Sequence, residues 1–131
     1  MASLTARRVL VVEDNLDTVQ TLARLLKDDG HRVEFAINGY AAIDIAKAFH
    51  PDVVLLDIGL PGLDGFEVCS RIKSNPELRD VCVIAVTAYA FDEHRARSRA
   101  VGCALHVVKP IDPACLLALV NATPRPVTNP D

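Results

Sequence analysis

Residues 51–62 read PDVVLLDIGLPG, an apolar run that ends abruptly on a single carboxylate, Asp57. Every position from Val53 to Leu56 is apolar, and a loop rich in glycine and proline follows. A short apolar run bounded by turn residues predicts a strand that is buried on both faces, as in parallel sheets. Asp57 would then lie at the carboxyl end of the strand, where open α/β sheets bind ligands. An aspartate in this place can also start a turn or cap the next helix.

The remainder of the chain alternates similar apolar runs with helical patterns. Apolar runs predict strands over residues 8–12, 33–36, 53–56, 81–86 and 105–108. Between and after them, helices are predicted around residues 16–26, 42–49, 66–72, 92–100 and 112–120. Alternation of this kind predicts a doubly wound α/β fold, with a parallel sheet covered on both faces and right-handed crossovers. Residues 92–100 are polar and rich in arginine, so this helix is expected to be the least firmly packed.

Size and composition exclude several classes of protein. The 131 residues suit one domain, and no apolar stretch approaches the length needed to cross a bilayer. The basic residues 1–8 are followed by too short an apolar run for a signal peptide, so we expect a cytoplasmic protein with no membrane association. A net charge of −3 without interleaved basic and aromatic residues argues against direct binding of nucleic acid.

The four cysteines are widely spaced and form no CxxC pair. They are Cys69, Cys82, Cys103 and Cys115. In a cytoplasmic chain this arrangement predicts reduced, buried small residues instead of disulfides or a zinc site.

Polar side chains follow four of the five predicted strands. They are Glu13 and Asp14, Asp57, Thr87, and Lys109. Each has a simple structural explanation, as a helix start, a turn or a solvated lysine, but their joint occurrence at one edge of a parallel sheet predicts a site. Clustered carboxylates require a compensating cation, and hard oxygen donors without histidine or cysteine favour Mg²⁺ over zinc. A metal, a lone carboxylate, a hydroxyl and a lysine are suited to phosphoryl transfer, with Asp57 as the nucleophile.

Four motifs make the chain similar to receiver domains of two-component response regulators. They are VVEDN at 11–15, DVVLLDIGLPGLDG at 52–65, VTAY at 86–89 and VKPI at 108–111. The resemblance runs from about residue 8 to residue 120, with the landmarks in order. It implies a flavodoxin-like (βα)₅ sandwich with strand order 2-1-3-4-5. It also divides the chain into an N-terminal extension (1–7), a receiver domain (8–121) and a flexible tail or cut linker (122–131).

The resemblance assigns a role to each motif residue. Asp57 is the expected phosphoacceptor, and the donor is the phosphohistidine of a sensor histidine kinase or of a histidine phosphotransfer protein. Mg²⁺, with Mn²⁺ as an alternative, is expected to bind Glu13, Asp14, Asp57 and the backbone carbonyl of Gly59. The phosphoryl group is expected to contact Thr87, Ala88 and Lys109. Gly59 and Tyr89 are expected to influence the lifetime of the phosphoryl group, and the bond between Lys109 and Pro110 is expected to be cis.

One position departs from the usual family pattern. Receivers commonly carry Tyr or Phe three residues before the lysine, and this chain has His106. His106 is interpreted either as a polar, pH-sensitive switch or as a partly exposed histidine of a strand end, and the second interpretation is preferred. The aromatic-switch description of the family therefore does not transfer directly.

The resemblance predicts a switch whose output surface includes the fourth and fifth helices. Phosphorylation of Asp57 would draw Thr87 and Lys109 toward the new oxygens and shift the weak helix at 92–100. Arg95, Arg97 and Arg99 would meet an acidic partner there or remain solvated. The downstream partner is not identified by the sequence, and a monomer or weak dimer is expected.

Three other functions are alternatives to the switch. An independent aspartyl phosphatase would carry a second acid two residues after the nucleophile, where this chain has Gly59. A flavin or nucleotide module would not place Glu13 and Asp14 beside a phosphate, because the charges repel. An interaction module that is never phosphorylated stays open.

Overall fold

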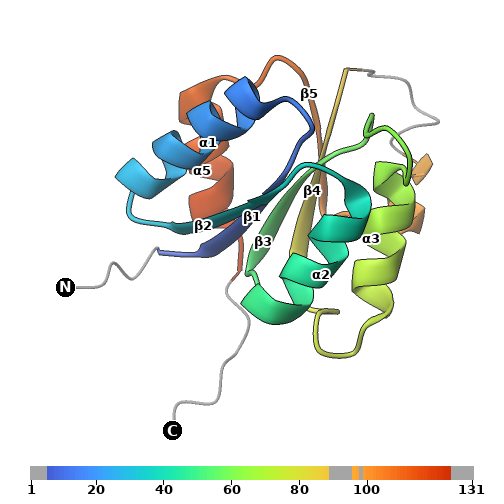
Figure 1. The fold of residues 1–131 in the computed structure, drawn as a ribbon. Coiled ribbons are helices and arrows are strands. Elements are labelled where there is room, and N and C mark those ends of the chain that lie inside the picture. Colours follow the sequence, from blue (N-terminus) through green and yellow to red (C-terminus); the bar gives the residue numbers. More distant parts are fainter. Residues whose placement is uncertain (1–5, 89–95, 98, 125–131) are drawn as a thin grey trace, which may run out of the picture.

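Five parallel strands form one sheet in the computed structural model, which describes residues 6–88, 96, 97 and 99–124 (Figure 1). The strands are β1 (Arg8–Val12), β2 (Arg32–Ala36), β3 (Val53–Asp57), β4 (Cys82–Thr87) and β5 (Leu105–Val108). Their spatial order is β2-β1-β3-β4-β5. The predicted doubly wound fold with order 2-1-3-4-5 is therefore confirmed.

Helices cover both faces of the sheet, with α1 and α5 on one side and α2 and α3 on the other (Figure 1). Their bounds are α1 (Leu16–Asp28), α2 (Gly39–Phe49), α3 (Gly65–Ser74) and α5 (Pro113–Ala122). The helix predicted over 92–100 lies largely outside the described residues, although 96, 97, 99 and 100 are helical. Tyr89 also lies outside them.

Side chains that alternate along the strands belong to two separate hydrophobic cores, one on each face of the sheet. In β1, Val9 and Val11 pack with α1 and α5, while Leu10 and Val12 pack with α2 and α3. This alternation follows from the pleat, which points successive side chains to opposite faces. All five residues of β3 are buried, as predicted for a strand covered on both sides. The site carboxylate Asp57 thus ends the strand that lies at the centre of the sheet.

Capping residues begin each helix close to the end of the preceding strand or loop. The side chains of Asn15, Asn38, Asp64 and Asp112 each accept a hydrogen bond from a backbone N–H in the first turn of the helix that follows. Such caps satisfy N–H groups that have no partner inside the helix. Asn15 caps α1, which leaves the Asp14 carboxylate available to the site.

Three details of the sequence prediction are corrected. Val81 is not in β4, because its N–H donates to Leu78 O in a turn, and the strand continues to Thr87 instead. Leu16 belongs to the apolar pattern that predicts a helix over residues 16–26, but it is the first residue of α1 and is 53% exposed. Cys115 is exposed on α5, whereas the other three cysteines are buried.

Arg7, a buried arginine that directly precedes β1, forms hydrogen bonds with the end of α5. Arg7 donates from Nε and a terminal nitrogen to Thr123 O, at 3.2 and 2.9 Å, and the same nitrogen lies 3.2 Å from Asn121 O. The carbonyls at the end of a helix lack partners within it, so a cation there is favourable. Arg7 lies just before the expected receiver domain (8–121) and Thr123 just after it, and both residues are buried.

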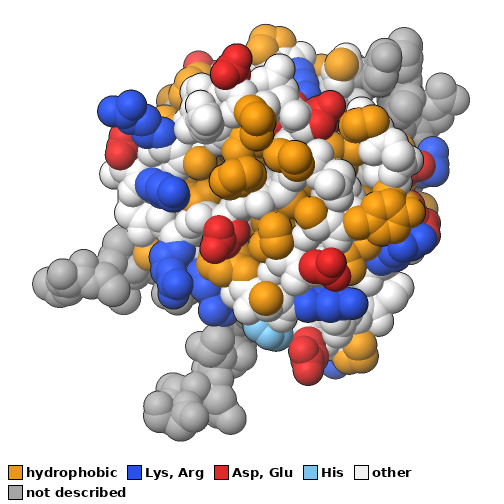
Figure 2. Space-filling view, in the orientation of Figure 1, with side chains coloured by type: hydrophobic (Ala, Val, Ile, Leu, Met, Phe, Trp, Pro, Cys, Tyr) orange, Lys and Arg blue, Asp and Glu red, His pale blue; other side chains and the backbone are white. Residues whose placement is uncertain are grey.

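Hydrophobic side chains group near the middle of the face shown in Figure 2. Large exposed hydrophobic residues include Phe35 in β2, Ile37 after it and Tyr40 in α2. The exposure of Phe35 is consistent with the position of β2 as an edge strand with a single neighbour. In the part of the chain that the structure describes, no helix has the length and apolar character required to span a membrane.

Candidate functional site

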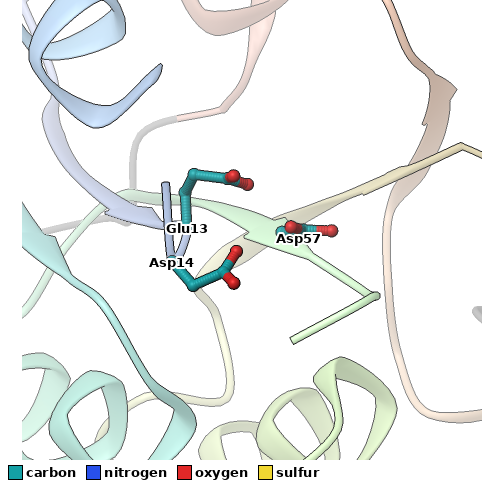
Figure 3. A group of neighbouring side chains, drawn as sticks. All are labelled: Glu13, Asp14 and Asp57. Atoms are coloured by element: carbon teal, nitrogen blue, oxygen red, sulfur yellow. The ribbon is translucent and has the colours of Figure 1, made fainter. Parts of the chain in front are cut away.

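Three carboxylates meet at the carboxyl edge of the sheet. Glu13 and Asp14 follow β1, Asp57 ends β3, and the three side chains turn toward one shared space (Figure 3). One carboxylate oxygen from each lies within 4.8 Å of the others. Glu13 and Asp57 are buried, while Asp14 is exposed. The arrangement therefore combines two sheltered acids with one that faces solvent.

Lys109 supplies a positive charge beside these acids. Its Nζ lies 3.3 Å from Glu13 Oε2 and 3.3 Å from Asp57 Oδ2. The lysine directly follows β5, so it extends across the end of β4 to reach β1 and β3. Burial alone would lower the pKa of Lys109, but the charges of Asp57 and Glu13 outweigh it and raise the pKa. Lys109 consequently stays charged and offsets part of the repulsion between the acids.

The Asp57 carboxylate is held at both oxygens. Gly59 N–H donates to Oδ1 at 2.9 Å, and Lys109 approaches Oδ2. Ile58 N–H donates to Val86 O at 2.9 Å, which extends the pairing of β3 with β4 past the carboxylate. A carboxylate fixed in this way loses little conformational freedom when it reacts, which favours its use as a nucleophile.

Glu13 carries a strongly perturbed carboxyl group. Burial is the main reason, followed by a hydrogen bond with Asp57 and the charge of Asp57, and Lys109 opposes them; together they raise the pKa of Glu13 to about 7. Backbone N–H of Asn15 lies 3.4 Å from Glu13 Oε1, and Glu13 N–H donates to Ala36 O. The sequence placed Glu13 in the site but gave no indication of its shifted pKa, which depends on burial and on the distance to Asp57.

Gly65 is a structural part of the site whose role the sequence reasoning did not recognise. A Cβ atom at Gly65 would lie 2.6 Å from Ile58 Cα and 2.8 Å from Asp57 O, too close for any side chain. Gly65 N–H also donates to Ile58 O at 3.3 Å. The first turn of α3 is thus packed directly against the backbone of the phosphoacceptor candidate. A glycine immediately after the capping Asp64 was the available signal.

The remaining predicted residues lie on β4 and β5. Thr87 is buried at the end of β4, is paired with Val108, and its carbonyl accepts the Lys109 N–H at 2.7 Å. Ala88 follows and is exposed. His106 is half-buried and paired with Ala85 inside β5. The bond between Lys109 and Pro110 is cis.

A cavity of about 290 Å³ opens beside the carboxylates. Glu13, Asp57 and Lys109 form its polar end. Its walls come from the sheet, from α1 and from the segment after β5, and are mostly apolar: Val11, Val12, Thr18, Leu22, Leu55, Val86, Pro110 and Ile111. Apolar walls reduce screening by water, so charges at the polar end interact strongly with a ligand.

The acidic group fits a hard divalent cation. Among the described residues (6–88, 96, 97 and 99–124), Glu13, Asp14 and Asp57 are the one cluster of at least three potential metal ligands. All of its donor atoms are carboxylate oxygens. Mg²⁺ prefers oxygen donors and keeps several waters, which an open site with one exposed acid permits. The raised pKa of Glu13 reports an excess of negative charge and burial that a bound cation would relieve.

Comparisons with known proteins agree on one family. The profile of the response regulator receiver domain matches residues 9–121. The polar-differentiation response regulator DivK of Brucella ovis is 38% identical over 105 residues, which cover 80% of this chain and 85% of that protein. The solved structure of the chemotaxis protein CheY4 of Vibrio cholerae is similar with a TM-score of 0.85 and 28% identity, covering 88% of this chain and 97% of that one.

A further solved structure is similar in fold and contains a bound metal ion. It is the receiver domain of a sensor histidine kinase from Pseudomonas aeruginosa, with a TM-score of 0.82 and 29% identity, covering 90% of this chain and 97% of that one. That structure has a magnesium ion coordinated in its active-site cleft. Sequence motifs, sheet topology and the position of the acidic group thus point to the same family.

Proposed function

Because the chain belongs to the response regulator receiver domain family, whose members act in phosphorylation-based signalling, we propose that Asp57 accepts a phosphoryl group and makes the domain a molecular switch. The observation that carries this proposal is the position of Asp57: it ends the central strand, Gly59 N–H holds one of its oxygens, and Lys109 lies 3.3 Å from the other. A nucleophile, a donor and a cation are therefore in place before any substrate arrives.

The phosphoryl donor is a phosphohistidine of a sensor histidine kinase or of a histidine phosphotransfer protein. An Asp57 oxygen attacks phosphorus and forms a C–O–P linkage while the P–N bond to the donor imidazole breaks. The electron pair of that bond remains on the imidazole nitrogen, which takes up a proton. The apolar walls of the cavity exclude water from the side of α1, which limits competing hydrolysis during transfer.

Glu13, Asp14 and Asp57, with the carbonyl of Gly59, would hold Mg²⁺ in this site. When bound, the ion supplies positive charge to the phosphoryl oxygens as negative charge develops on them. The negative charge of the three carboxylates favours binding of the ion. Asp14 is exposed, so one side of the site is accessible to solvent. The magnesium ion in the similar kinase receiver supports this assignment.

Lys109 and Thr87 are positioned to respond to the product. A phosphoryl group on Asp57 adds up to roughly two negative charges at the point that Lys109 already contacts. Thr87 is joined to Lys109 through the backbone hydrogen bond between β4 and β5, so movement of one strand end is transmitted to the other. We expect a downstream protein to recognise the surface of the helix predicted over residues 92–100 and of α5.

The direct test is phosphorylation in vitro. The protein is incubated with acetyl phosphate and Mg²⁺, and intact mass spectrometry should show one added phosphoryl group. Asp57→Asn should abolish the adduct, chelation of the metal should suppress it, and Asp44→Asn, which changes an exposed aspartate of α2, should leave it intact. Incubation of the same protein with a phosphorylated histidine phosphotransfer protein, in place of acetyl phosphate, tests whether a phosphohistidine is the donor.

The outcomes also separate this function from an interaction module that is never phosphorylated. An adduct that depends on Asp57 excludes that alternative. Absence of any adduct, or an equal adduct in Asp57→Asn, would contradict the proposal. An independent phosphatase stays disfavoured because Gly59 occupies the position where such enzymes need a second acid, and its N–H instead binds Asp57.

A further inference from the structure

Two buried thiols touch each other on the face of the sheet that α2 and α3 cover. Cys69 lies in α3 and is 0% exposed, while Cys103 lies just before Ala104 and the last strand and is 7% exposed. Their sulfur atoms are 3.4 Å apart, with Cys103 as the hydrogen-bond donor and Cys69 as the acceptor. Cys69 in turn donates to Val101 O at 3.3 Å. The two residues are 34 positions apart in the sequence, so the fold alone brings them together.

The other two cysteines do not compete for this contact. Cys82 belongs to the core on the opposite face of the sheet, together with α1 and α5. Cys115 is exposed on α5. The cysteines also do not form a group of three or more metal-ligating atoms among the residues that the structure describes. Cys69 and Cys103 are therefore the two thiols in direct contact, and the phosphoryl site does not use them.

Lys73 makes the surroundings of the pair electropositive. Its side chain lies over Gly102, where an added Cβ would be 3.2 Å from Lys73 Cγ, and its Nζ donates to Val81 O at 2.8 Å. The hydrogen bond from Cys103, with a contribution from Lys73, lowers the pKa of Cys69 although burial opposes this. The same hydrogen bond, together with burial, raises the pKa of Cys103. Cys69 is consequently the thiol that ionises first, and Cys103 is the one that keeps its proton.

We propose that Cys69 and Cys103 are a reversible oxidation site that forms an intramolecular disulfide. A disulfide requires the sulfur atoms to approach to about 2.05 Å, so a contact of 3.4 Å must shorten by a movement that side-chain rotation and small backbone shifts can supply. The bond would join α3 to the segment that leads into β5. This site is independent of the proposed phosphoryl transfer.

A peroxide is the oxidant that the buried position admits, because it is small. The Cys69 thiolate attacks one oxygen of hydrogen peroxide, the O–O bond breaks, and the products after proton transfer are a sulfenic acid and water. Cys103 sulfur then attacks the Cys69 sulfur, the S–O bond breaks, and the hydroxyl leaves as a second water with the Cys103 proton. Two thiols and one peroxide thus give one disulfide and two waters, and a dithiol reductant reverses the change.

The crosslink would act on the strand that precedes Lys109. Cys103 is followed by Ala104, whose N–H donates to Val83 O at 2.8 Å and starts the pairing of β5 with β4. A covalent link from α3 to this point closes a loop around β4 and restricts opening of the β5 end. The oxidised protein should therefore unfold at a higher temperature, and the amide of Ala104 should exchange its hydrogen more slowly than in the reduced protein.

The test starts from the full chain carrying Cys115→Ser, which removes the exposed thiol and prevents crosslinking between molecules. Treatment with hydrogen peroxide at a small molar excess, followed by alkylation and tryptic digestion without reductant, should give one linked peptide pair that contains Cys69 and Cys103. Dithiothreitol should restore both free thiols. Cys103→Ala should remove the linked pair, and the matched control Cys82→Ala should retain it.

Mapping in the Cys115→Ser chain, which retains the three buried cysteines, keeps the test decisive even if a core variant folds poorly. A disulfide that involves Cys82, a stable sulfinic acid at Cys69 without a crosslink, or thiols that resist peroxide until the protein unfolds would each overturn the proposal. Circular dichroism of Cys103→Ala establishes whether loss of the crosslink reflects loss of the thiol or loss of the fold.

Discussion

The ammonium nitrogen of Lys109 lies 3.3 Å from Asp57 Oδ2, so the residue that follows β5 compensates the charge at the end of β3. A metal ion bound by the acids would share these oxygens with the lysine. We therefore expect Lys109→Met to bind Mg²⁺ about three- to tenfold more tightly, since a competing positive charge is removed at a partly exposed site. Isothermal titration calorimetry measures this change directly.

The same substitution should slow phosphorylation by acetyl phosphate, because the phosphoryl oxygens lose a charged donor. Lys47→Met is the matched control, since Lys47 is an exposed lysine of α2, and both quantities should stay at wild-type values. Weaker binding of Mg²⁺ by Lys109→Met would show that the lysine helps to shape the metal site and does not compete with the ion.

The stability of the metal-free protein should depend on the protonation of Glu13. Its pKa is raised from 4.5 to about 7, so the folded state binds the proton more tightly than the unfolded chain. Protonation of Glu13 therefore stabilises the folded state fully below pH 4.5, and this stabilisation is lost as the pH rises to about 7. This loss is on the order of 2–3 kcal/mol in the free energy of unfolding. Urea denaturation in the presence of a chelator, repeated across this pH range, measures it.

Glu13→Gln should flatten that pH dependence, because the amide does not titrate. Glu34→Gln, which changes an exposed acid of β2, should keep the wild-type slope. Equal slopes for the wild type and Glu13→Gln would show that another group is responsible. Addition of Mg²⁺ should reduce the loss in the wild type, since the ion binds the deprotonated acid.

The contact between α3 and the end of β3 should tolerate no side chain at Gly65. In Gly65→Ala the new Cβ would overlap the backbone at Ile58 Cα and Asp57 O, at 2.6 and 2.8 Å. We expect a loss of about 2–3 kcal/mol in the free energy of unfolding and slower phosphorylation, because neither backbone atom can move without displacing Asp57. Chemical denaturation and the acetyl phosphate assay provide the two measurements.

Gly59→Ala is the informative comparison for this prediction. Its Cβ would lie 3.5 Å from Asp57 Oδ1, an ordinary contact, so stability should change by less than about 1 kcal/mol. If Gly65→Ala is as stable as Gly59→Ala, the packing of α3 against the site is looser than the structure indicates.

Removal of the Arg7 side chain should loosen the end of α5. In Arg7→Ala the carbonyls of Asn121 and Thr123 lose their donor, and we expect a loss of about 1–3 kcal/mol in the free energy of unfolding. Hydrogen exchange should accelerate in the last turn of α5. Arg24→Ala, at an exposed arginine of α1, should leave both quantities unchanged. Unchanged exchange in Arg7→Ala would mean that water replaces the guanidinium without cost.

The sequence predicted those features that depend on periodicity and on residue type. Apolar runs located all five strands, and their alternation with helices sufficed for the sheet order once the family motifs were recognised. The shift of β4 by one residue was not predictable, since Val81 is as apolar as its neighbours and only the turn at Leu78 excludes it. Likewise, Cys115 resembles a core residue until its helix is placed on the sheet.

In the site, the chemical types were predictable but their interactions were not. Glu13, Asp14, Asp57 and Lys109 could be brought together because parallel strands end at one edge. The pKa of Glu13 depends on burial and on distances that no motif contains. The same applies to Gly65 and to the contact between Cys69 and Cys103, which join segments far apart in the chain.

The link between Arg7 and Thr123 also determines where another polypeptide could be attached. It lies at the start of β1, whereas the carboxylates lie at the opposite edge, beyond the ends of β1 and β3. A fluorescent protein or an affinity handle fused near either of these residues would therefore be anchored on the far side from Asp57. Such a fusion should leave phosphorylation of Asp57 unobstructed, which makes the domain suitable for reporter designs.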